Sequence, residues 1–259
     1  MIGIGWRSNL AAWIRERPAG IECLEIIPDH FMDSGGSVLE QLAVDYPLCM
    51  HGLSCSLATP GPLDEEYVSS MQRVARVCRP RWASEHIAFT RAGGIDLGHL
   101  NPVPPTHANL RILVEHAREL QERLELPLLL ENITSSLRLE GQMPENEFII
   151  ELCRQADCGL LLDVTNLYIN SRNHGFDPQT WLDLLPRGIV RQLHVVGFTV
   201  DESGRLHDSH DQALQPELLE LIARVIHDFE PEAVILERDD SAARSPEIAQ
   251  ELEALHALR

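Results

Sequence analysis

Eight short runs of apolar and β-branched residues recur along the chain, each of a length that suits one strand. They are Ile2–Trp6, Cys23–Ile27, Leu48–Leu53, Trp82–Phe89, Pro127–Asn132, Gly159–Val164, Arg191–Phe198 and Ala233–Asp239. A continuous apolar run is typical of a parallel strand that is buried on both faces of its sheet. We therefore expect a parallel sheet that is covered by helices.

The stretches between these runs have helical spacing. In Thr106–Leu124, for example, Leu110, Leu113 and Leu120 fall on one face. The other predicted helices are Ser37–Asp45, Asp64–Cys78, Met143–Gln155, Asp177–Leu185, Gln215–Phe229 and Ser245–Leu258. This alternation predicts one α/β domain over residues 1–259, folded as a closed (β/α)8 TIM barrel. A doubly wound open sheet is the alternative, but the first turn, GIGWRS, lacks its glycine-rich fingerprint.

Polar side chains stand where the apolar runs end. The six are His51, His86, Glu131, Asp163, His194 and Glu237. In a closed barrel all strand C-termini face one rim, so residues distant in sequence converge there. We therefore expect these imidazoles and carboxylates to surround one mouth.

Two segments that follow strands add candidates. After Asp163 the strand gives way to a predicted polar loop that holds Asn166 and Asn173. In LHDSHD, Asp208 and His210 stand two residues apart and could both reach one ion from an extended backbone, with His207 expected to face solvent. The alternative for this segment is a solvated loop that binds no ion. Glycines and an acidic pair before this segment predict a hairpin that returns over the mouth.

The charges around the mouth would repel one another unless they were neutralised, and bound metal ions are the simplest way to neutralise them. Mixed imidazole and carboxylate ligands suit iron, manganese or zinc better than calcium or magnesium. The alternative for each residue alone is a hydrogen-bonded structural role. Arg7, at the end of the first run, either faces the mouth to hold an anionic group or pairs with a ring carboxylate. The remaining histidines are expected at surface or capping positions: His99, His107, His116, His227 and His256.

The bulk properties exclude several classes of protein. The net charge of −19, from 40 acidic and 21 basic residues, disfavours nucleic acid as a partner. No stretch approaches a membrane span and the start of the chain lacks a signal pattern, so a cytoplasmic protein is expected. The six cysteines contain no CxxC pair and are expected to be buried thiols.

Several motifs, taken in order, resemble those of one family: MHGLSCSLATPGPLD, SEHIAF, LLLENITSSL, LLLDVTNLYINSRNHGFDP, QLHVVGF, HDSH and LERDD. The chain resembles the multinuclear non-haem iron-dependent oxidative enzymes over nearly its whole length. This family includes the methanobactin-forming oxidase and the thiaglutamate-pathway enzyme. The resemblance implies a xylose-isomerase-like barrel with two or three irons of mixed Fe(II)/Fe(III) valence and O2 as co-substrate.

The resemblance further implies a ribosomally made precursor peptide as substrate, with Cys as the first target and a C-terminal Asp or Asn as the second. It also implies a small partner protein that binds the leader peptide. Carried over, it makes all nine candidates iron ligands: His51, His86, Glu131, Asp163, Asn166, His194, Asp208, His210 and Glu237. Residues expected to support them or contact substrate are Arg7, Asp29, His30, Asn132 and Asn173.

The sequence departs from the family pattern near the mouth. Arg7-Ser8-Asn9 lacks the usual histidine, Asp29-His30-Phe31 replaces Glu-Asn-Phe/Tyr, and Gly197-Phe198 replaces Gly-His. These changes are expected to alter substrate choice. Two other functions stay open: a redox-silent divalent-metal hydrolase or isomerase on the same barrel, and a non-catalytic metal-binding subunit. The chain has no lysine, although a lysine usually lies near the metals of an aldose isomerase.

Overall fold

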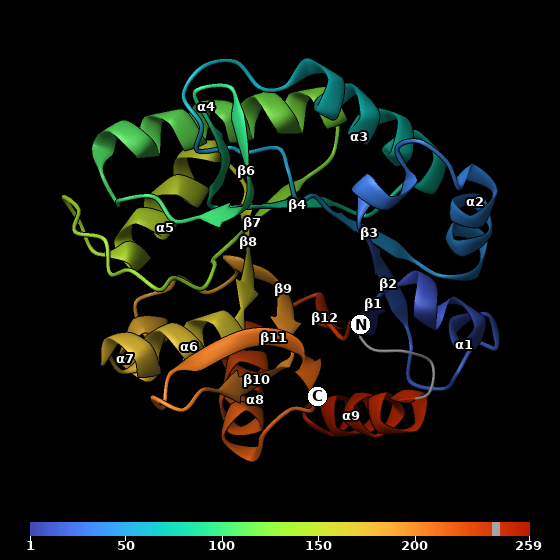
Figure 1. Cartoon of the computed structure of the whole chain (residues 1–259). Helices are drawn as coiled ribbons and strands as arrows, with labels where there is room; N and C mark the ends of the chain where they lie inside the picture. Colours follow the sequence, from blue (N-terminus) through green and yellow to red (C-terminus); the bar gives the residue numbers. More distant parts are fainter. Residues whose placement is uncertain (240–243) are drawn as a thin grey trace.

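The computed structural model describes residues 1–239 and 244–259. In it, parallel strands close into a barrel in the order β1-β12-β9-β8-β7-β4-β3-β2. These strands are β1 (Ile2–Gly5), β2 (Cys23–Ile26), β3 (Leu48–His51), β4 (Ala83–His86), β7 (Leu128–Glu131), β8 (Gly159–Asp163), β9 (Val190–Val195) and β12 (Ala233–Leu236). Figure 1 shows them at the centre of the molecule with the helices around them. The predicted barrel is confirmed, and each predicted run overlaps one barrel strand.

The helices pack outside the barrel through their apolar faces. They are α1 (Ala11–Arg15), α2 (Gly36–Asp45), α3 (Glu65–Cys78), α4 (His107–Leu124), α5 (Glu145–Ala156), α6 (Val164–His174), α7 (Pro178–Leu182), α8 (Pro216–Phe229) and α9 (Ser245–Ala257), with short 3-10 turns η1 (Ser8–Leu10) and η2 (Pro28–Phe31). Local caps fix where several begin. The Asp64 carboxylate accepts the backbone N–H of Tyr67 at 3.0 Å at the start of α3, which satisfies a donor that no helical carbonyl reaches.

The prediction of a polar loop after Asp163 is wrong, because residues 164–174 form α6. Asp163 caps this helix by accepting the backbone N–H of Asn166 at 2.7 Å, and Gly175 ends it with φ of +71°. The polar residues that suggested a loop are buried or half-buried and bond to neighbouring segments. Asn170, for example, donates to the carbonyl of Ile133 at 2.9 Å and accepts from the N–H of Ser135 at 3.0 Å.

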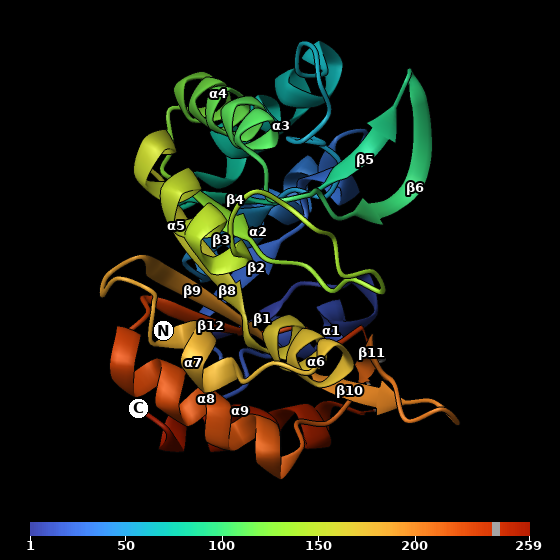
Figure 2. The ribbon, with the colours of Figure 1, turned by 90° about the vertical axis from the view of Figure 1, so that its left-hand side faces the viewer.

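Two antiparallel hairpins stand beside the barrel mouth. One pairs β5 (Phe89–Ala92) with β6 (Ile95–Asn101), and the other pairs β10 (Gly197–Val200) with β11 (Leu206–Gln212). Figure 2 shows both on the same side of the barrel, with the chain that follows β7 between them. The second hairpin was predicted from its glycines and acidic pair. The first has no apolar pattern, because most of β6 is exposed.

The inner face of the barrel is largely apolar at one level and polar at the next. A buried cluster of Cys23, Cys49, Trp82, Leu129, Leu161, Ala233 and Ile235 fills the lower level. Side chains alternate between the two faces of a strand, so the residue two positions further along each strand also points inward. Six such residues are Glu25, His51, Ser84, Glu131, Asp163 and Glu237. An apolar floor therefore supports a polar layer near the mouth.

Two further predictions can be checked against the fold. The six cysteines are free, and five of them are buried, as expected for structural thiols. The prediction that His116 is a surface or capping residue is wrong, because its ring is buried and lies 2.7 Å from each of the carbonyl oxygens of Leu57 and Gly61. Among the described residues, no helix has both the length and the apolarity needed to cross a bilayer.

Candidate metal centre

Six strands bring one predicted donor each to the mouth. His51, His86, Glu131 and Asp163 are the last residues of β3, β4, β7 and β8. His194 stands one residue before the end of β9, and Glu237 directly follows β12. None of the six is more than 7% exposed. The structure thus gathers these six predicted residues in one buried layer.

Glu131 lies at the centre of this layer and contacts three imidazoles. Its Oε2 is 3.3 Å from His51 Nε2 and 3.1 Å from His86 Nε2. Its Oε1 is 3.1 Å from His194 Nδ1. The donor atoms of His51, His86 and Glu131 lie within 4.8 Å of one another, which is close enough to surround one ion.

A second group shares the Glu131 carboxylate. It consists of Glu131, Asp163, His194 and Glu237, whose donor atoms also lie within 4.8 Å of one another. His194 Nδ1 is 3.0 Å from Glu237 Oε2. One Glu131 oxygen faces His51 and His86 of the first group, and the other faces His194 of the second.

Asn166, Asp208 and His210 line one cavity together with His51, His86, Glu131, Asp163 and Glu237, but Asp208 and His210 belong to neither of the two groups above. We refer to Asn166, Asp208 and His210 as the third set. The Oδ1 atoms of Asn166 and Asp208 and the Nδ1 atom of His210 are buried without a hydrogen-bond partner among the described residues. His210 has a φ of +55°, a backbone conformation that is uncommon outside glycine and often occurs at functional sites. Asp208 and His210 contact each other at 3.0 Å through Oδ2 and Nε2.

The buried carboxylates of this layer shift the pKa values of their neighbours in a way that favours a bound cation. Burial raises the pKa of Asp163 well above its usual value, and the Glu131 and Asp208 carboxylates raise it further. Burial alone would lower the pKa of His194, but the Glu237 and Glu25 carboxylates outweigh this effect and raise it well above its usual value. Buried carboxylates are costly unless they are paired or bind a metal. A metal ion held by these residues would relieve this conflict by favouring the ionised form of Asp163.

The donor atoms fit such an ion. Glu131 Oε2 is also buried without a hydrogen-bond partner among the described residues. The first two groups, which share Glu131, and the third set therefore each contain an atom that could bind a metal ion. The groups contain imidazole nitrogens and carboxylate oxygens with no thiolate, within the described part of the chain. This mixture suits iron, manganese or zinc in a catalytic rather than a structural site.

The outer nitrogens of the imidazoles also have partners, which fix the ring orientations. His51 Nδ1 is 2.9 Å from Ser84 Oγ, and His86 Nδ1 is 3.2 Å from Glu85 Oε1. His194 Nε2 is 2.8 Å from Glu25 Oε1. Protein metal sites commonly orient their histidines in this way. Each ring therefore turns its other nitrogen toward Glu131.

Glu25 and Glu85 are buried site residues that the strand-end pattern did not identify; each is 1% exposed. Both lie inside a strand rather than at its end, so a search for polar strand ends passes over them. A signal was nevertheless present. Glu25 interrupts the apolar run Cys23–Ile27, and a carboxylate inside a buried strand must have a partner.

Arg7, Asn132 and Asn173 take positions around the predicted ligands. Arg7 lines the cavity and pairs with Asp239 at 2.5 Å and with Glu237 at 3.8 Å. Asn132 bonds to both the N–H and the carbonyl of Asp163 at 3.0 and 2.9 Å. Asn173 lies farther from the mouth and holds the backbone of Leu206 through bonds of 2.8 and 3.0 Å. It therefore anchors the hairpin that carries Asp208 and His210.

The other predicted contact residues differ in their positions. His30 lines the cavity, whereas the Asp29 carboxylate accepts a 2.9 Å hydrogen bond from the Tyr67 hydroxyl. His207 is exposed and contacts Asp201, as predicted. His99, expected at the surface, is an exposed residue of β6 that also borders the cavity.

The cavity above the donors has a volume of about 850 Å³. Its walls include Asp96 and His99 from the hairpin β5–β6, as well as Ile133 from the segment after β7. A second cavity of about 910 Å³ adjoins it at Ile133 and is lined largely by apolar side chains, among them Met143 and Trp181. Each cavity is within the range of about 300–1,000 Å³ that is typical of ligand pockets.

A family model described as the RiPP precursor modification enzyme MbnB/TglH/ChrH matches residues 1–259, where RiPP denotes a ribosomally synthesised and post-translationally modified peptide. The chain belongs to the MbnB/TglH/ChrH family. Its relatives include a UPF0276 protein of Anaeromyxobacter sp. (strain Fw109-5), 35% identical over 254 residues that cover 96% of this chain and 89% of the relative. A UPF0276 protein of Caulobacter vibrioides is 33% identical over 248 residues, 93% of this chain and 87% of the relative. The family resemblance inferred from the motifs is confirmed.

Solved structures share the fold of this MbnB/TglH/ChrH member. Endonuclease IV from Thermus thermophilus superposes with a TM-score of 0.64 at 19% identity, over 99% of this chain and 98% of that chain. A D-psicose 3-epimerase superposes with a TM-score of 0.61 at 13% identity, over 99% of this chain and 96% of that chain. At such identities these likenesses establish a xylose-isomerase-like barrel and nothing about the reaction.

Proposed function

We propose that the protein is a multinuclear iron enzyme that uses O2 to modify a residue of a ribosomally made precursor peptide. Membership of a RiPP-modifying family supports the peptide substrate. The observation that carries the metal assignment is the Glu131 carboxylate, which is shared between two groups of donors. Iron bound there would supply one-electron redox chemistry, with dioxygen as the oxidant.

The residues of the chain would hold and orient the metal rather than act as nucleophiles. His51 and His86 with Glu131 would hold one ion, and Asp163, His194 and Glu237 would share Glu131 to hold a second. Asn166, Asp208 and His210 would hold a third. The buried partners of the imidazoles keep these rings in place, while the cavity of about 850 Å³ leaves room for a peptide side chain to approach.

We propose cysteine as the first target residue and a C-terminal Asp or Asn as the second. A cysteine thiolate is a strong ligand for iron and could bind at an open coordination position. A small separate partner protein would capture the leader peptide and present the rest of the peptide to the mouth. The reaction would take place in the cytoplasm, where the precursor is made.

The test is a reaction of the anaerobically iron-loaded protein with a short Cys-containing peptide encoded beside its gene, followed by mass spectrometry. We expect an O2-dependent mass change at one residue in the wild type and none with Glu131→Gln. A zinc- or manganese-loaded protein that acts on a sugar or an ester would favour the hydrolase or isomerase instead. A protein that binds metal and transforms none of these substrates would favour a non-catalytic subunit.

A further inference from the structure

A chain of buried polar side chains runs beneath the metal centre, inside the barrel. Trp82 Nε1 donates to Gln192 Oε1 at 2.6 Å, and Gln192 Nε2 donates to Glu25 Oε2. Glu25 in turn contacts His194 Nε2 at 2.8 Å through Oε1 and at 2.9 Å through Oε2. All four residues are 3% exposed or less. Polar groups buried this deeply are costly, so a complete set of hydrogen bonds is needed to keep them.

The hydrogen-bond roles follow in order from Trp82. An indole N–H can only donate, so the Gln192 oxygen must face it and the Gln192 NH2 must face Glu25. An ionised carboxylate can only accept. Both Glu25 oxygens face His194 Nε2, so this nitrogen must carry a proton. Gln192 Nε2 also lies 3.1 Å from His194 Nε2, but a bare lone pair on that nitrogen would then point at two carboxylate oxygens.

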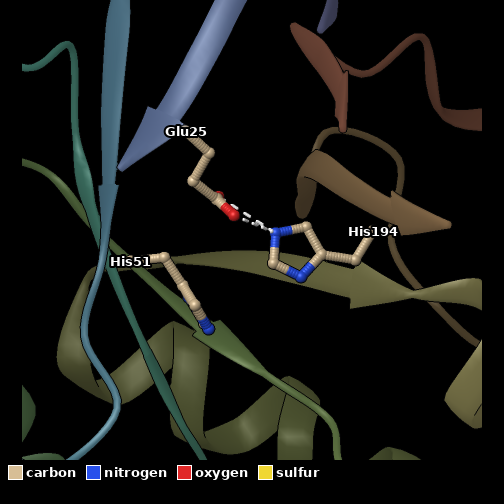
Figure 3. Close-up of side chains that lie close together, drawn as sticks. All are labelled: Glu25, His51 and His194. Carbon is tan, nitrogen blue, oxygen red and sulfur yellow. Dashed lines mark hydrogen bonds and ion pairs between the residues drawn. The ribbon is translucent and has the colours of Figure 1, made fainter. Parts of the chain in front are cut away.

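The other nitrogen of His194, Nδ1, also faces carboxylates, so a metal ion that binds there would take the place of a proton on this nitrogen. Nδ1 lies 3.1 Å from Glu131 Oε1 and 3.0 Å from Glu237 Oε2, among the donors of the second group. Figure 3 shows Glu25 reaching one ring nitrogen of His194 while the second nitrogen points away from Glu25. A neutral imidazole with its proton on Nε2 has its lone pair on Nδ1.

We propose that Glu25 is a positioning residue, held by Gln192 and Trp82, that fixes the tautomer and the ring orientation of His194 for metal binding. Glu25 could itself be considered a ligand, since its carboxylate also lies within 4.8 Å of donor atoms of His51 and His194. Each of its oxygens, however, already has a partner, since Oε2 accepts from the Gln192 NH2 and Oε1 faces the His194 N–H at 2.8 Å. The inference rests on the metal centre proposed above but does not depend on which metal fills it.

These hydrogen-bond roles predict which substitutions disturb the site. In Glu25→Gln, the new amide places an NH2 group against either the Gln192 NH2 or the His194 N–H, so one donor faces another donor. In the double variant Glu25→Gln/Gln192→Glu, residue 192 accepts from Trp82 and from the new amide at position 25, whose oxygen accepts from His194. The double variant therefore restores every hydrogen bond with the same total charge.

The experiment titrates anaerobic apoprotein with Fe(II) in competition with a chelator and records a Mössbauer spectrum of the loaded protein. We expect Glu25→Gln to lower the affinity for one iron ion by about 10–100-fold, as do substitutions of other partners of metal-bound histidines. The quadrupole doublet of that ion should also change. The double variant should recover most of the affinity and the wild-type doublet. Trp82→Phe, which removes the indole N–H and keeps an aromatic ring, should have a smaller effect in the same direction.

Wild-type affinity and an unchanged spectrum in Glu25→Gln would overturn the proposal, as would a folded double variant no better than the single one. If Glu25→Gln does not fold, Fe(II) affinity and the Mössbauer spectrum of Trp82→Phe test the proposal instead. An unchanged spectrum in Trp82→Phe would then overturn it. If the wild type takes up zinc rather than iron, the proposed oxidase fails. The ratio of variant to wild-type affinity for Zn(II) then still tests Glu25.

Discussion

The donors carried by strands and the donors carried by the hairpin β10–β11 lie at or beneath one cavity but are held differently. The six strand donors follow an apolar floor and are at most 7% exposed. The side chains of Asp208 and His210 are 20% and 24% exposed and stand on a two-stranded hairpin. A barrel strand is fixed by neighbours on both sides, whereas a hairpin depends on a few anchors. We infer a rigid pair of metal positions and a third position that is easier to vary.

The hairpin anchors can be named. Asn173 on α6 holds both backbone groups of Leu206, and the backbone N–H of Asp239 donates to the carbonyl of His210 at 2.9 Å. Together with the pairing of β10 with β11 and the packing of the hairpin on α6, these contacts hold the third set of donors relative to the other two. Disturbing them should affect the third ion first.

The largest effect is expected from Glu131→Gln. Its carboxylate serves both strand-borne groups, so the substitution should abolish binding of two ions and lower affinity beyond the roughly 10–100-fold of an outer partner. Metal content by plasma mass spectrometry would measure this loss. Glu66→Gln, at an exposed position of α3, is the control and should keep the full content. A Glu131→Gln protein that retains all its metal would contradict the bridging role.

A smaller loss, of a single ion, is expected from His210→Ala. The hairpin donors belong to the third set alone, so the two strand-borne ions should remain. His207→Ala removes a neighbouring histidine of the same strand whose side chain is 52% exposed, and it should leave metal content unchanged. Loss of all ions in His210→Ala would show that the hairpin and the strands form one inseparable site.

The smallest effect is expected from Asn173→Ala, which leaves every ligand in place. Loss of its two bonds to Leu206 should lower the free energy of unfolding by about 1–3 kcal/mol. It should also lower the affinity for the third ion and leave the affinities for the other two unchanged. Denaturant unfolding and metal titration would measure the two effects, with Arg172→Ala at the adjacent exposed position as control. An equal weakening of all ions would remove the distinction between the two regions.

This contrast also explains what the sequence could predict. Strand ends such as Glu131 and Asp163 were identifiable because an apolar run stops at a carboxylate, and a barrel brings such ends together. The strand-end pattern did not identify Glu25 and Glu85 because both lie within strands. Glu25 points inward, which only the alternation of faces reveals, whereas Glu85 lies between the inward-pointing Ser84 and His86 and so points to the opposite face. Noticing that Glu25 stands two residues beyond the floor residue Cys23 would have placed it in the polar layer.

The remaining errors have tertiary causes. The asparagines of α6 indicated a loop because such residues favour turns, and their buried partners, such as Ile133 for Asn170, lie far away in sequence. The ring of His116 is buried against two carbonyl groups of a distant loop, which its helical spacing does not reveal. The hairpin β5–β6 has mostly exposed residues, so it lacks the apolar alternation that identifies a strand.

The most direct test of the central claim is the metal content of protein grown in iron-57 and purified without oxygen, read together with its Mössbauer spectrum. The account predicts two or three irons per chain, with coupled ferrous and ferric signals. Stoichiometric zinc or manganese, with no O2-dependent activity after reconstitution with iron, would contradict it.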